Sequence, residues 1–359
     1  MYKRQEYSYN YQNWYPSVEY ETNNTLINVG LYDLSPFSKL EIKSEKAYED
    51  LQRICTSNIK QEPGKCTYTH MLNEGGGIET DLTVVCIDKN HFRIISSAAV
   101  RTHDKAHILK YLSKSVEFKD VTDDLICLGI FGPKSRELLS KITSENLTNE
   151  NFKFGTSKSI NFKSIEVWVQ RLSYVGELGY ELYIESHDAK EIYDLIVTAG
   201  KDFGLTHCGA HTMDIMRMES GFLHWGHDIS PEENQYQANL NFAISYKKPF
   251  DFIGKEKLLE IKNQKIDRRF VMLTLKESVP GKPLLLHEEP IYLENEIIGK
   301  TTSGNYSFNY NKNLSFGYIK SDLSNEQLNM KNLYIEVEKK KYEAQLITKP
   351  LKEGAFKNI

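Results

Sequence analysis

The sequence predicts an α+β fold in which two split β-α-β halves are followed by a small β-barrel. Between residues 25 and 260, short strand-like runs alternate with helical runs in two successive halves, each with strands, a helix and further strands. After about Lys265 the pattern changes to short, regularly spaced strands separated by turn residues, without a long helix. The length of 359 residues suits two or three domains.

The individual elements follow from hydrophobic periodicity. Residues 1–24 are rich in Tyr and Asn, have no clean period, and are interpreted as a lead-in. Helices are predicted over 44–57, 104–115, 133–143, 188–204 and 210–219. Strands are predicted over 77–87, 91–98, 124–132, 165–173 and 179–186, and in the barrel over 268–275, 288–307, 314–320 and 333–347.

Composition and charge argue against several classes of partner. The net charge of −4 offers no overall reason to bind nucleic acid or an anionic membrane. No apolar run approaches the roughly 20 residues needed to cross a bilayer. The first fifteen residues lack the apolar core of a signal peptide. We therefore expect a cytoplasmic protein, or one of the mitochondrial matrix in a eukaryote, with no nucleic-acid or membrane partner.

The five cysteines are odd in number and widely scattered, and no pair has Cys-x-x-Cys spacing. This pattern favours reduced, mostly buried thiols over a disulfide framework or a zinc site. They are Cys55, Cys66, Cys86, Cys127 and Cys208.

The most distinctive local motif is "YTHMLNEGGGIETDLTV", residues 68–84. Gly75, Gly76 and Gly77 predict a tight turn between two strands. The motif lacks the Gly-Lys-Ser/Thr ending and the following helix of a phosphate-binding loop. Alternation places three polar residues on one strand face, where an acid can point into a cleft; the alternative is a solvated strand face. They are Glu79, Asp81 and Thr83, with Ile78, Leu82 and Val84 on the other face.

A second motif, "RLSYVGELGYELYI", covers residues 171–184. Aromatic rings beside a carboxylate suit a flat heterocycle with ring N–H donors, since the ring can stack and the carboxylate can accept two parallel hydrogen bonds. The alternative is a tyrosine-rich hairpin packed on a neighbouring sheet. Gly176 and Gly179 bracket the turn, and the polar or aromatic residues are Tyr174, Glu177, Tyr180, Glu181 and Tyr183.

The third motif is "MDIMRMESGFLHWGHDISP", residues 213–231. Its helix should stop near Ser220 and Gly221, and Asp214 and Arg217 share one side of it. Arg217 is suited to holding a ligand carboxylate in a forked contact, and the alternative is an exposed pair with Asp214.

Other site chemistry has little support in the sequence. His224 and His227 lie beside Asp228, but no further ligand cluster has suitable spacing, so no metal site is predicted. There is no Gly-x-Ser-x-Gly, His-Glu-x-x-His, or Gly-x-Gly-x-x-Gly after a strand. Without the Gly-x-Gly-x-x-Gly motif, the chain is not expected to bind a flavin or nicotinamide cofactor in the way that motif does.

Six phrases in order along the chain resemble the glycine-cleavage T-protein (aminomethyltransferase) family, from about residue 25 to 350. They are "GLYDLSPFSK", "YTHMLNEGGGIETDLTV", "IFGPKSRELL", "RLSYVGELGYELY", "HWGHDISPE" and "DFIGKE". The likeness is greatest to the C-terminal folate-binding module of dimethylglycine and sarcosine dehydrogenases, to which "RLSYVGELGYELY" and "HWGHDISPE" point in particular.

The resemblance implies a three-domain cloverleaf with tetrahydrofolate in a central channel. Residues 25–260 would form the folate-binding region of two ferredoxin-like subdomains, and 265–351 the C-terminal barrel domain. Asp81 would be the catalytic acid beside the reactive folate nitrogens. The cofactor-binding positions implied are Glu181 on the pterin N–H groups, Tyr174 packed beside it, Thr83 in the pocket, Ile95 as a backbone contact, and Arg217 near the folate tail.

The implied function is transfer of a formaldehyde-level carbon from dimethylglycine or sarcosine to tetrahydrofolate, which forms methylene-tetrahydrofolate. Asp81 would accept or relay the proton lost by the folate amine, an effect worth roughly 10²–10⁴-fold. One alternative is a stand-alone aminomethyltransferase that works with a lipoyl carrier protein. Another, from a different class, is a non-catalytic folate-sensing or regulatory protein.

The expected partners are a methylated amine or glycine derivative and a flavin dehydrogenase domain or subunit. "YNYQNWYPSVEYE" resembles the joint to such a domain, whereas the first five residues, MYKRQ, do not. FAD is therefore expected only through a missing or partner domain.

Three residues depart from the family pattern. Gln237 stands where Glu is usual, Asn239 where Gly is usual, and His211 where Arg is usual. We expect these differences to change the polarity near the rim of the folate pocket.

Overall fold

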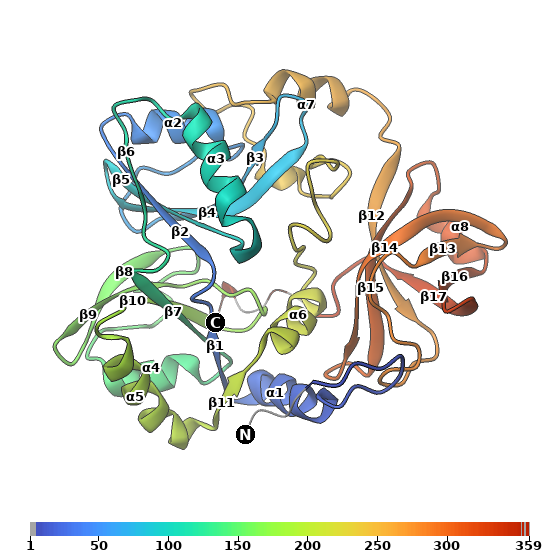
Figure 1. The fold of residues 1–359 in the computed structure, drawn as a ribbon, viewed down its shortest axis with the longest axis horizontal. Helices are drawn as coiled ribbons and strands as arrows, with labels where there is room; N and C mark the ends of the chain where they lie inside the picture. Colours follow the sequence, from blue (N-terminus) through green and yellow to red (C-terminus); the bar gives the residue numbers. More distant parts are fainter. Residues whose placement is uncertain (1–4, 353, 355–356, 359) are drawn as a thin grey trace.

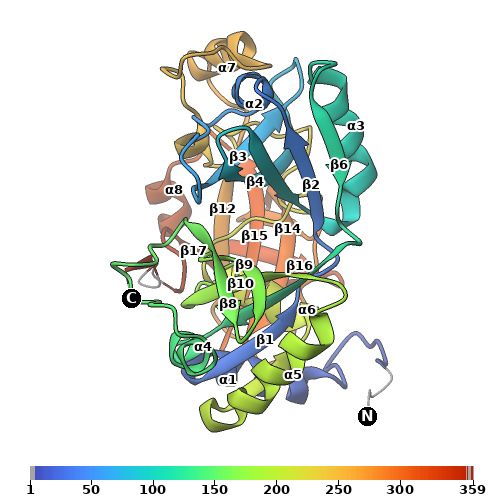
Figure 2. The same ribbon diagram turned by 90° about the vertical axis from the view of Figure 1, so that its left-hand side faces the viewer.

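The computed structural model describes residues 5–352, 354 and 357–358, so residues 1–4 of the MYKRQ segment lie outside it. Figure 1 shows three lobes around a central region that contains the helix α6 (Ala210–Glu219). In the side view of Figure 2 the lobe that contains β2 to β6 lies above the lobe that contains β1 and β8 to β10. The predicted α+β fold with three lobes is confirmed.

The first lobe is a five-stranded antiparallel sheet with the order β3-β4-β5-β2-β6. Its core packs the apolar side of the sheet against two helices, with Leu51, Leu82, Ile94 and Ile108 among the buried residues. Its elements are β2 (Ser38–Lys43), α2 (Ala47–Ile54), β3 (Cys66–Leu72), β4 (Ile78–Asp88), β5 (His91–Ser96), η1 (Ala98–Val100), α3 (Arg101–Tyr111) and β6 (Glu117–Asp120).

The second lobe is a six-stranded sheet with the order β11-β1-β7-β10-β9-β8. Its strand β1 precedes the whole first lobe in the chain and pairs in parallel with β11, Val29 opposite Leu205. The first lobe is therefore inserted between β1 and β7. The elements are β1 (Val29–Asp33), β7 (Leu125–Phe131), α4 (Ser135–Ile142), β8 (Ser157–Phe162), β9 (Ile165–Gln170), β10 (Gly179–Glu185), α5 (Ala189–Gly200), η2 (Lys201–Phe203) and β11 (Leu205–Cys208).

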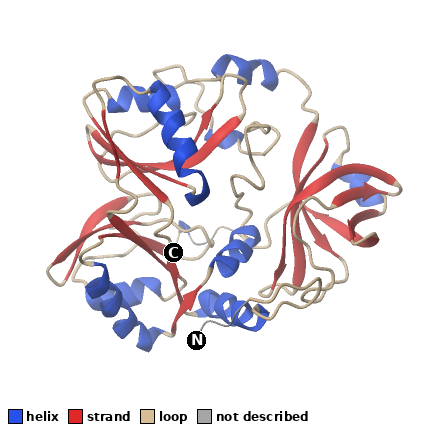
Figure 3. Cartoon of the chain, in the orientation of Figure 1, coloured by secondary structure: helices blue, strands red, loops and turns tan. Residues whose placement is uncertain are grey.

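The third lobe is a closed barrel in which the strands follow the order β12-β15-β14-β13-β16-β17. It is almost entirely strand apart from short α8, whereas helices flank the other two sheets (Figure 3). The predicted small barrel is thus confirmed. Its elements, after η3 (Asn241–Ala243) and α7 (Lys255–Lys262), are β12 (Arg268–Leu275), β13 (Pro290–Leu293), β14 (Glu296–Ser307), β15 (Lys312–Lys320), α8 (Asn325–Met330), β16 (Leu333–Val337) and β17 (Lys340–Ile347).

The N-terminal segment contains a helix that its sequence pattern did not predict, α1 (Tyr15–Ile27). Tyr15 and Val18 pack with Ile215 of α6 and with the barrel residues Tyr306 and Phe308. The segment read as a lead-in therefore also joins the barrel to the centre of the molecule.

Most predicted boundaries agree with the structure to within a few residues, but the predicted strands 288–307 and 333–347 are each two strands, β13 and β14, and β16 and β17. Helix α6 has the predicted bounds, and Gly221 beyond its end has a φ of +74°, which favours glycine. Helix α3 begins at Arg101, three residues before the predicted start, and ends at Tyr111, four before the predicted end. All five cysteines are free thiols, three of them buried. Among the described residues, no helix has both the length and the apolar character needed to cross a membrane.

Candidate functional site

The β3–β4 hairpin positions the first predicted site residue. Asn73 closes the glycine turn, since its N–H donates to Gly77 O at 3.0 Å and its side-chain oxygen accepts from the Gly77 N–H at 3.0 Å. Beyond the turn, Asp81 and Thr83 are partly accessible and Leu82 between them is buried. The predicted alternation along β4 is therefore confirmed.

Asp81 is held in a desolvated environment. The Tyr68 hydroxyl donates a hydrogen bond to Asp81 Oδ2 at 3.1 Å. Burial raises the pKa of Asp81 to about 6; the Tyr68 hydrogen bond opposes that rise and the nearby charge of Asp104 adds to it. Asp81 is only partly accessible and accepts the Tyr68 hydrogen bond, so it does not lie on a fully solvated strand face, which is the alternative interpretation.

Thr83 and Ile95 continue the same side of the sheet. They lie directly opposite each other in the register of β4 and β5. Ile95 packs against a cluster that includes Val175 and Tyr183 of the second lobe and Met216 of α6. This side of the first sheet therefore faces the second lobe and the central helix.

The second lobe contributes one face of strands β9 and β10. Along β10, Tyr180 and Leu182 are part of the lobe's core, so the residues between them point to the other side. On that side Glu181 lies opposite Gln170, and Tyr183 lies opposite Trp168. These four side chains of β9 and β10 share one face of the sheet, and we call them the β9–β10 face.

Glu181 is the titratable group of the β9–β10 face. The Tyr183 hydroxyl donates to Glu181 Oε2 at 2.8 Å. Burial raises the pKa of Glu181 to about 7, and the Tyr183 hydrogen bond partly offsets that rise. The charge of Glu181 in turn contributes to the raised pKa of Cys66 on β3, so Glu181 lies within electrostatic reach of the first lobe.

Tyr174 lies between the other candidate groups. Its hydroxyl donates to Leu223 O at 3.0 Å, and its ring stacks on Phe222 with centroids 6.1 Å apart and an interplanar angle of 15°. Burial raises the pKa of Tyr174, the charge of Arg217 lowers it and that of Asp81 raises it. The structure thus brings Tyr174 within electrostatic reach of both predicted site residues.

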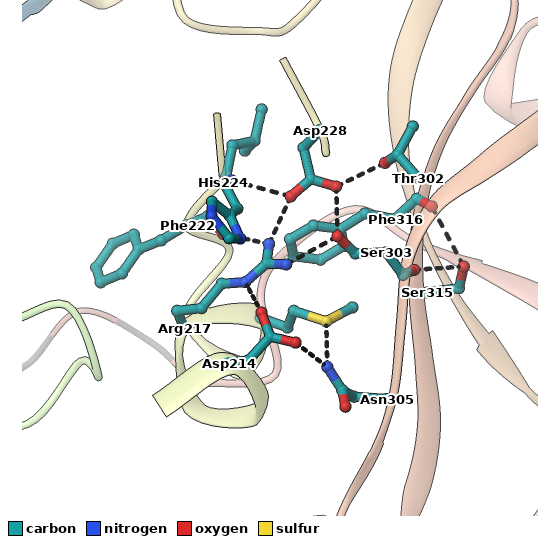
Figure 4. Close-up of polar contacts among 12 residues, drawn as sticks. Asp214, Arg217, Phe222, His224, Asp228, Thr302, Ser303, Asn305, Ser315 and Phe316 are labelled. Carbon is teal, nitrogen blue, oxygen red and sulfur yellow. Dashed lines mark hydrogen bonds and ion pairs between the residues drawn. The ribbon is translucent and has the colours of Figure 1, made fainter. Parts of the chain in front are cut away.

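Arg217 is buried and heavily committed to contacts inside the protein (Figure 4). It is 1% exposed, so the alternative of an exposed pair with Asp214 is wrong, although the pair itself exists at 2.8 Å. Four of its five N–H donors already bond protein atoms. The acceptors are Asp214 Oδ1, Phe222 O, Asp228 Oδ2 and Ser303 Oγ. A contact with the folate tail stays a prediction, with at most one N–H left for it.

The two histidines of the third motif pack on each other, with ring centroids 4.7 Å apart. Between them in sequence, Trp225 donates its indole N–H to Ile78 O at 3.0 Å, which links the central loop to β4. Within the described ranges, no three His, Cys, Asp or Glu side chains are grouped so that they could hold a metal ion.

Two of the three departures from the family pattern, Gln237 and His211, have side-chain contacts in the structure. Gln237 bonds Asn234 and, at 2.6 Å, Asp267 next to the barrel. His211 is exposed and stacks on Trp14, centroids 5.3 Å apart. Asn239 is exposed and has a φ of +58°, which Asn tolerates better than most residues that replace glycine. The expectation that these three residues change the polarity of the pocket rim stays a prediction.

The groups present fit a flat heterocycle of the tetrahydropterin type. Glu181 can accept ring N–H groups, and Tyr174 and Tyr183 supply aromatic surface. On the β9–β10 face, both amide atoms of Gln170 and the indole N–H of Trp168 are buried with no hydrogen-bond partner among the described residues. Buried polar atoms normally have partners, so such atoms beside Glu181 are suited to ligand recognition.

Sequence reasoning overlooked two polar residues at this site, Tyr68 and His70, although a signal for them was present. Both lie in the glycine-turn motif, at alternate positions of the strand that pairs with β4. In the structure His70 lies opposite Asp81 and Tyr68 opposite Thr83, because a bulge between Met71 and Leu72 shifts the register by one residue from what counting back from the turn would give. Gln170 and Trp168 had no such signal, because their importance depends on the pairing of β9 with β10.

Two family models match the chain. The model described as "GCVT N-terminal domain" matches residues 2–248, and "Glycine cleavage T-protein C-terminal barrel domain" matches residues 268–352. Together they cover both sheet lobes and the barrel.

Curated relatives and a solved structure agree with these matches. Mitochondrial dimethylglycine dehydrogenase of Rattus norvegicus is 34% identical over 96% of this chain, which spans only 40% of that protein. An aminomethyltransferase of Halothermothrix orenii is 31% identical over 86% of this chain and 85% of its own length. The crystal structure of aminomethyltransferase T from Bartonella henselae has the same fold, with a TM-score of 0.83, 20% identity, and coverage of 98% of this chain and 94% of that one.

Proposed function

Because the chain belongs to the glycine-cleavage T-protein family, with its folate-dependent aminomethyltransferase type of function, we propose that it accepts a formaldehyde-level carbon from a methylated glycine. The donor would be dimethylglycine or sarcosine, and the product methylene-tetrahydrofolate. One observation carries the proposal: Asp81 of the first lobe and Glu181 of the second lobe are partly buried carboxyl groups, and each accepts a hydrogen bond from a tyrosine hydroxyl.

Glu181 and its neighbours would bind and orient the pterin. The Glu181 carboxylate would accept N–H groups of the ring, with one oxygen already fixed by Tyr183. The unpartnered Gln170 amide on the same face can meet a ring carbonyl with its N–H₂ or a ring N–H with its oxygen. Tyr174, anchored through Leu223, would pack beside the ring.

Asp81 would handle the proton. Tetrahydrofolate supplies a secondary amine, which can attack an electrophilic one-carbon unit. With a pKa near 6, Asp81 is mostly ionised at neutral pH yet close enough to it to act as a general base. A non-catalytic folate sensor would have no need for an acid tuned in this way, which supports the enzymatic interpretation.

A flavin-bearing partner would perform the oxidation that releases the carbon. The proposal is supported by the 34% identity with a dimethylglycine dehydrogenase of which this chain spans 40%. The remaining length of that relative offers room for an oxidising domain. In this proposal FAD is bound by that partner domain or subunit, and this chain receives the carbon.

A second candidate is a stand-alone aminomethyltransferase that takes the carbon from a lipoyl carrier protein. It is favoured by the Halothermothrix orenii aminomethyltransferase, 85% of whose length this chain matches. The two candidates differ in mass balance. Transfer of the methylene from an aminomethyl group leaves ammonia, whereas a formaldehyde-level carbon leaves none.

The first experiment is calorimetric titration of tetrahydrofolate into the wild type and into Glu181→Gln. We expect binding by the wild type and clearly weaker binding by the variant. Tetrahydrofolate is then offered with dimethylglycine and a flavin dehydrogenase, or with an aminomethyl-lipoyl carrier, and product and ammonia are measured. Product without ammonia supports the first candidate, and product with ammonia the second. Absence of binding by the wild type would overturn both.

A further inference from the structure

Behind Asp81 lies a row of hydrogen bonds that the proposed reaction does not yet use. The Tyr68 hydroxyl, which donates to Asp81 Oδ2 at 3.1 Å, also lies 3.2 Å from His70 Nε2. The other ring nitrogen, His70 Nδ1, lies 3.4 Å from the amide nitrogen of Gln235. Four side chains therefore form one continuous row that ends at the proposed base.

The donors and acceptors give this row a direction. In this structure the Gln235 amide nitrogen faces the ring, and the amide oxygen is buried without a partner among the described residues, so His70 Nδ1 accepts from Gln235. His70 is fully buried, and burial lowers its pKa to about 3, so the ring is neutral and has one proton. With Nδ1 as acceptor, that proton is on Nε2 and is donated to the Tyr68 oxygen. The Tyr68 proton then points to Asp81.

His70 and Gln235 are buried and held by backbone hydrogen bonds, whereas Tyr68 is 38% exposed. The backbone N–H of His70 donates to Thr56 Oγ1 at 3.3 Å, and its carbonyl accepts from the Thr56 N–H at 2.9 Å. Gln235 is fully buried, and its backbone carbonyl accepts a hydrogen bond from the Leu240 N–H at 2.8 Å. The Tyr68 ring stacks on Phe242, with an interplanar angle of 20°. The row joins a loop at the centre of the molecule to the first lobe.

We propose that Tyr68 and His70 are positioning residues for Asp81, and that the Gln235–His70–Tyr68 row aims the phenol proton at Oδ2 so that Oδ1 is left for the proton of the substrate amine. This inference rests on the proposed role of Asp81 as the base. The hydrogen bond from Tyr68 also opposes the effect that the surroundings have on the pKa of Asp81. Burial and the charge of Asp104 favour its neutral form, while the bond from Tyr68 favours the ionised form.

Among the described residues, the charge that acts on Asp81 is that of Asp104. Asp81 interacts electrically with Tyr68, Asp104 and Tyr174, and the phenols are neutral because burial raises their pKa values. The shift of His70 is due to burial alone. Asp81 is therefore expected to respond more to loss of the Tyr68 hydroxyl, which bonds it, than to loss of the Tyr174 hydroxyl, which bonds Leu223.

The first test is the tautomer of His70, read from ¹⁵N chemical shifts of the imidazole nitrogens in the full chain, with His70→Gln used for assignment. We expect a neutral ring with its proton on Nε2 from neutral pH down to at least pH 5. A proton on Nδ1, or a ring that becomes charged in this range, would overturn the direction of the row. The tautomer itself is read from the wild type, and His70→Gln serves only to assign the signal.

The second test is the pKa of Asp81, followed by ¹³C carboxyl shifts and assigned with Asp81→Asn. Loss of a hydrogen bond to a charged group in Tyr68→Phe should raise this pKa by about 1–2 pH units. Tyr180→Phe removes a phenol on the opposite side of β10, which bonds Arg136, and should leave the pKa of Asp81 unchanged. An unchanged pKa in Tyr68→Phe would overturn the proposal.

The same variants separate positioning from binding. In Tyr68→Phe the acid limb of the pH–kcat profile should move upward with the pKa of Asp81, while KM for tetrahydrofolate changes less than threefold. His70→Gln, whose amide N–H can replace Nε2–H, should keep more of the wild-type profile than His70→Leu does. Both NMR tests are made without folate, so failure of the wild type to bind folate would refute the proposed function and leave the hydrogen-bonded row standing.

Discussion

Arg217 and Asp228 form an ion pair that is shut off from solvent, with Nη1 2.5 Å from Oδ2 and side-chain exposures of 1% and 0%. Asp228 also accepts hydrogen bonds from Thr302 and Ser303 of β14, at 2.6 and 2.8 Å. The pair thus connects α6, the central loop and the barrel (Figure 4). Arg217, which is expected near the folate tail, therefore has a structural role, because its contacts join three parts of the chain.

Removal of the Arg217 charge should destabilise the protein strongly. Arg217→Met would leave Asp228 buried without its counter-ion, a change that typically costs about 3–5 kcal/mol. Urea denaturation, followed by circular dichroism, should show a markedly lower midpoint. Lys190→Met is the control, because Lys190 forms an exposed pair with Asp194 and little change is expected. Equal midpoints for the two variants would contradict the structural role of Arg217.

Glu181→Gln should stabilise the ligand-free protein and weaken folate binding. Burial raises the folded-state pKa of Glu181 from 4.5 to about 7, so the folded chain holds this proton more tightly than the unfolded chain. Stability from this group is therefore present below pH 4.5 and lost as the pH rises to about 7. Above pH 7 the glutamine variant should be more stable by about 1–3 kcal/mol. Thermal denaturation at several pH values measures the difference.

The same Glu181 variant should bind tetrahydrofolate about 10- to 100-fold more weakly, because one charged acceptor is lost. The control is Glu185→Gln at the exposed end of the same strand, which should alter neither property. If Glu181→Gln changed the free energy of unfolding equally at pH 4 and pH 8, the change would not be linked to the ionisation of Glu181. If folate affinity stayed the same, Glu181 would not be the pterin acceptor.

Gly176→Ala should lower the free energy of unfolding for two separable reasons. Gly176 has a φ of +70°, and a Cβ there would lie 1.9 Å from Ser220 Oγ at the end of α6. Gly155 has a similar φ of +74°, but nothing lies within 4 Å of its Cβ position. Gly155→Ala should thus cost about 1 kcal/mol from the backbone alone. Gly176→Ala should cost about 1–3 kcal/mol more from steric overlap.

A comparison of urea midpoints for the two alanine variants tests the close approach of the 173–178 loop to α6. Tyr174 lies two residues before Gly176, so Gly176→Ala should also weaken folate binding in calorimetry. Gly155→Ala should leave binding intact. Similar midpoints and similar affinities for both variants would show that the approach to Ser220 does not position Tyr174.

Local pattern was enough to predict the parts of the site that depend on strand period and turn chemistry. Asp81 and Thr83 share a face because successive side chains of β4 alternate, and the three glycines before them form the predicted turn. The barrel strands were predictable for the same reason. The end of α6 followed from Gly221, whose positive φ few other residues adopt.

Features that depend on distant partners were not predictable in this way. Helix α1 has no apolar stripe, and its polar residue Asn24 bonds Gly204 O, 180 positions away. The partners of Arg217 include Ser303, which follows it by 86 residues, so its burial left no trace in the local sequence. The insertion of the first lobe after β1 depends on the parallel pairing of β1 with β11, which no nearby residue specifies.

Asp81→Asn should reduce turnover far more than binding. Loss of the general base is expected to lower kcat about 10²–10⁴-fold. The affinity for tetrahydrofolate should change little, because Glu181 and Tyr174 remain. In the wild type, kcat should rise with pH through about 6, since the base must be ionised, and this limb should be absent from the variant's residual activity. Asp88→Asn, at the exposed end of the same strand, is the control and should keep the wild-type profile. If Asp81→Asn bound folate poorly but turned over normally once saturated, Asp81 would be a ligand contact and another group would have to take the proton.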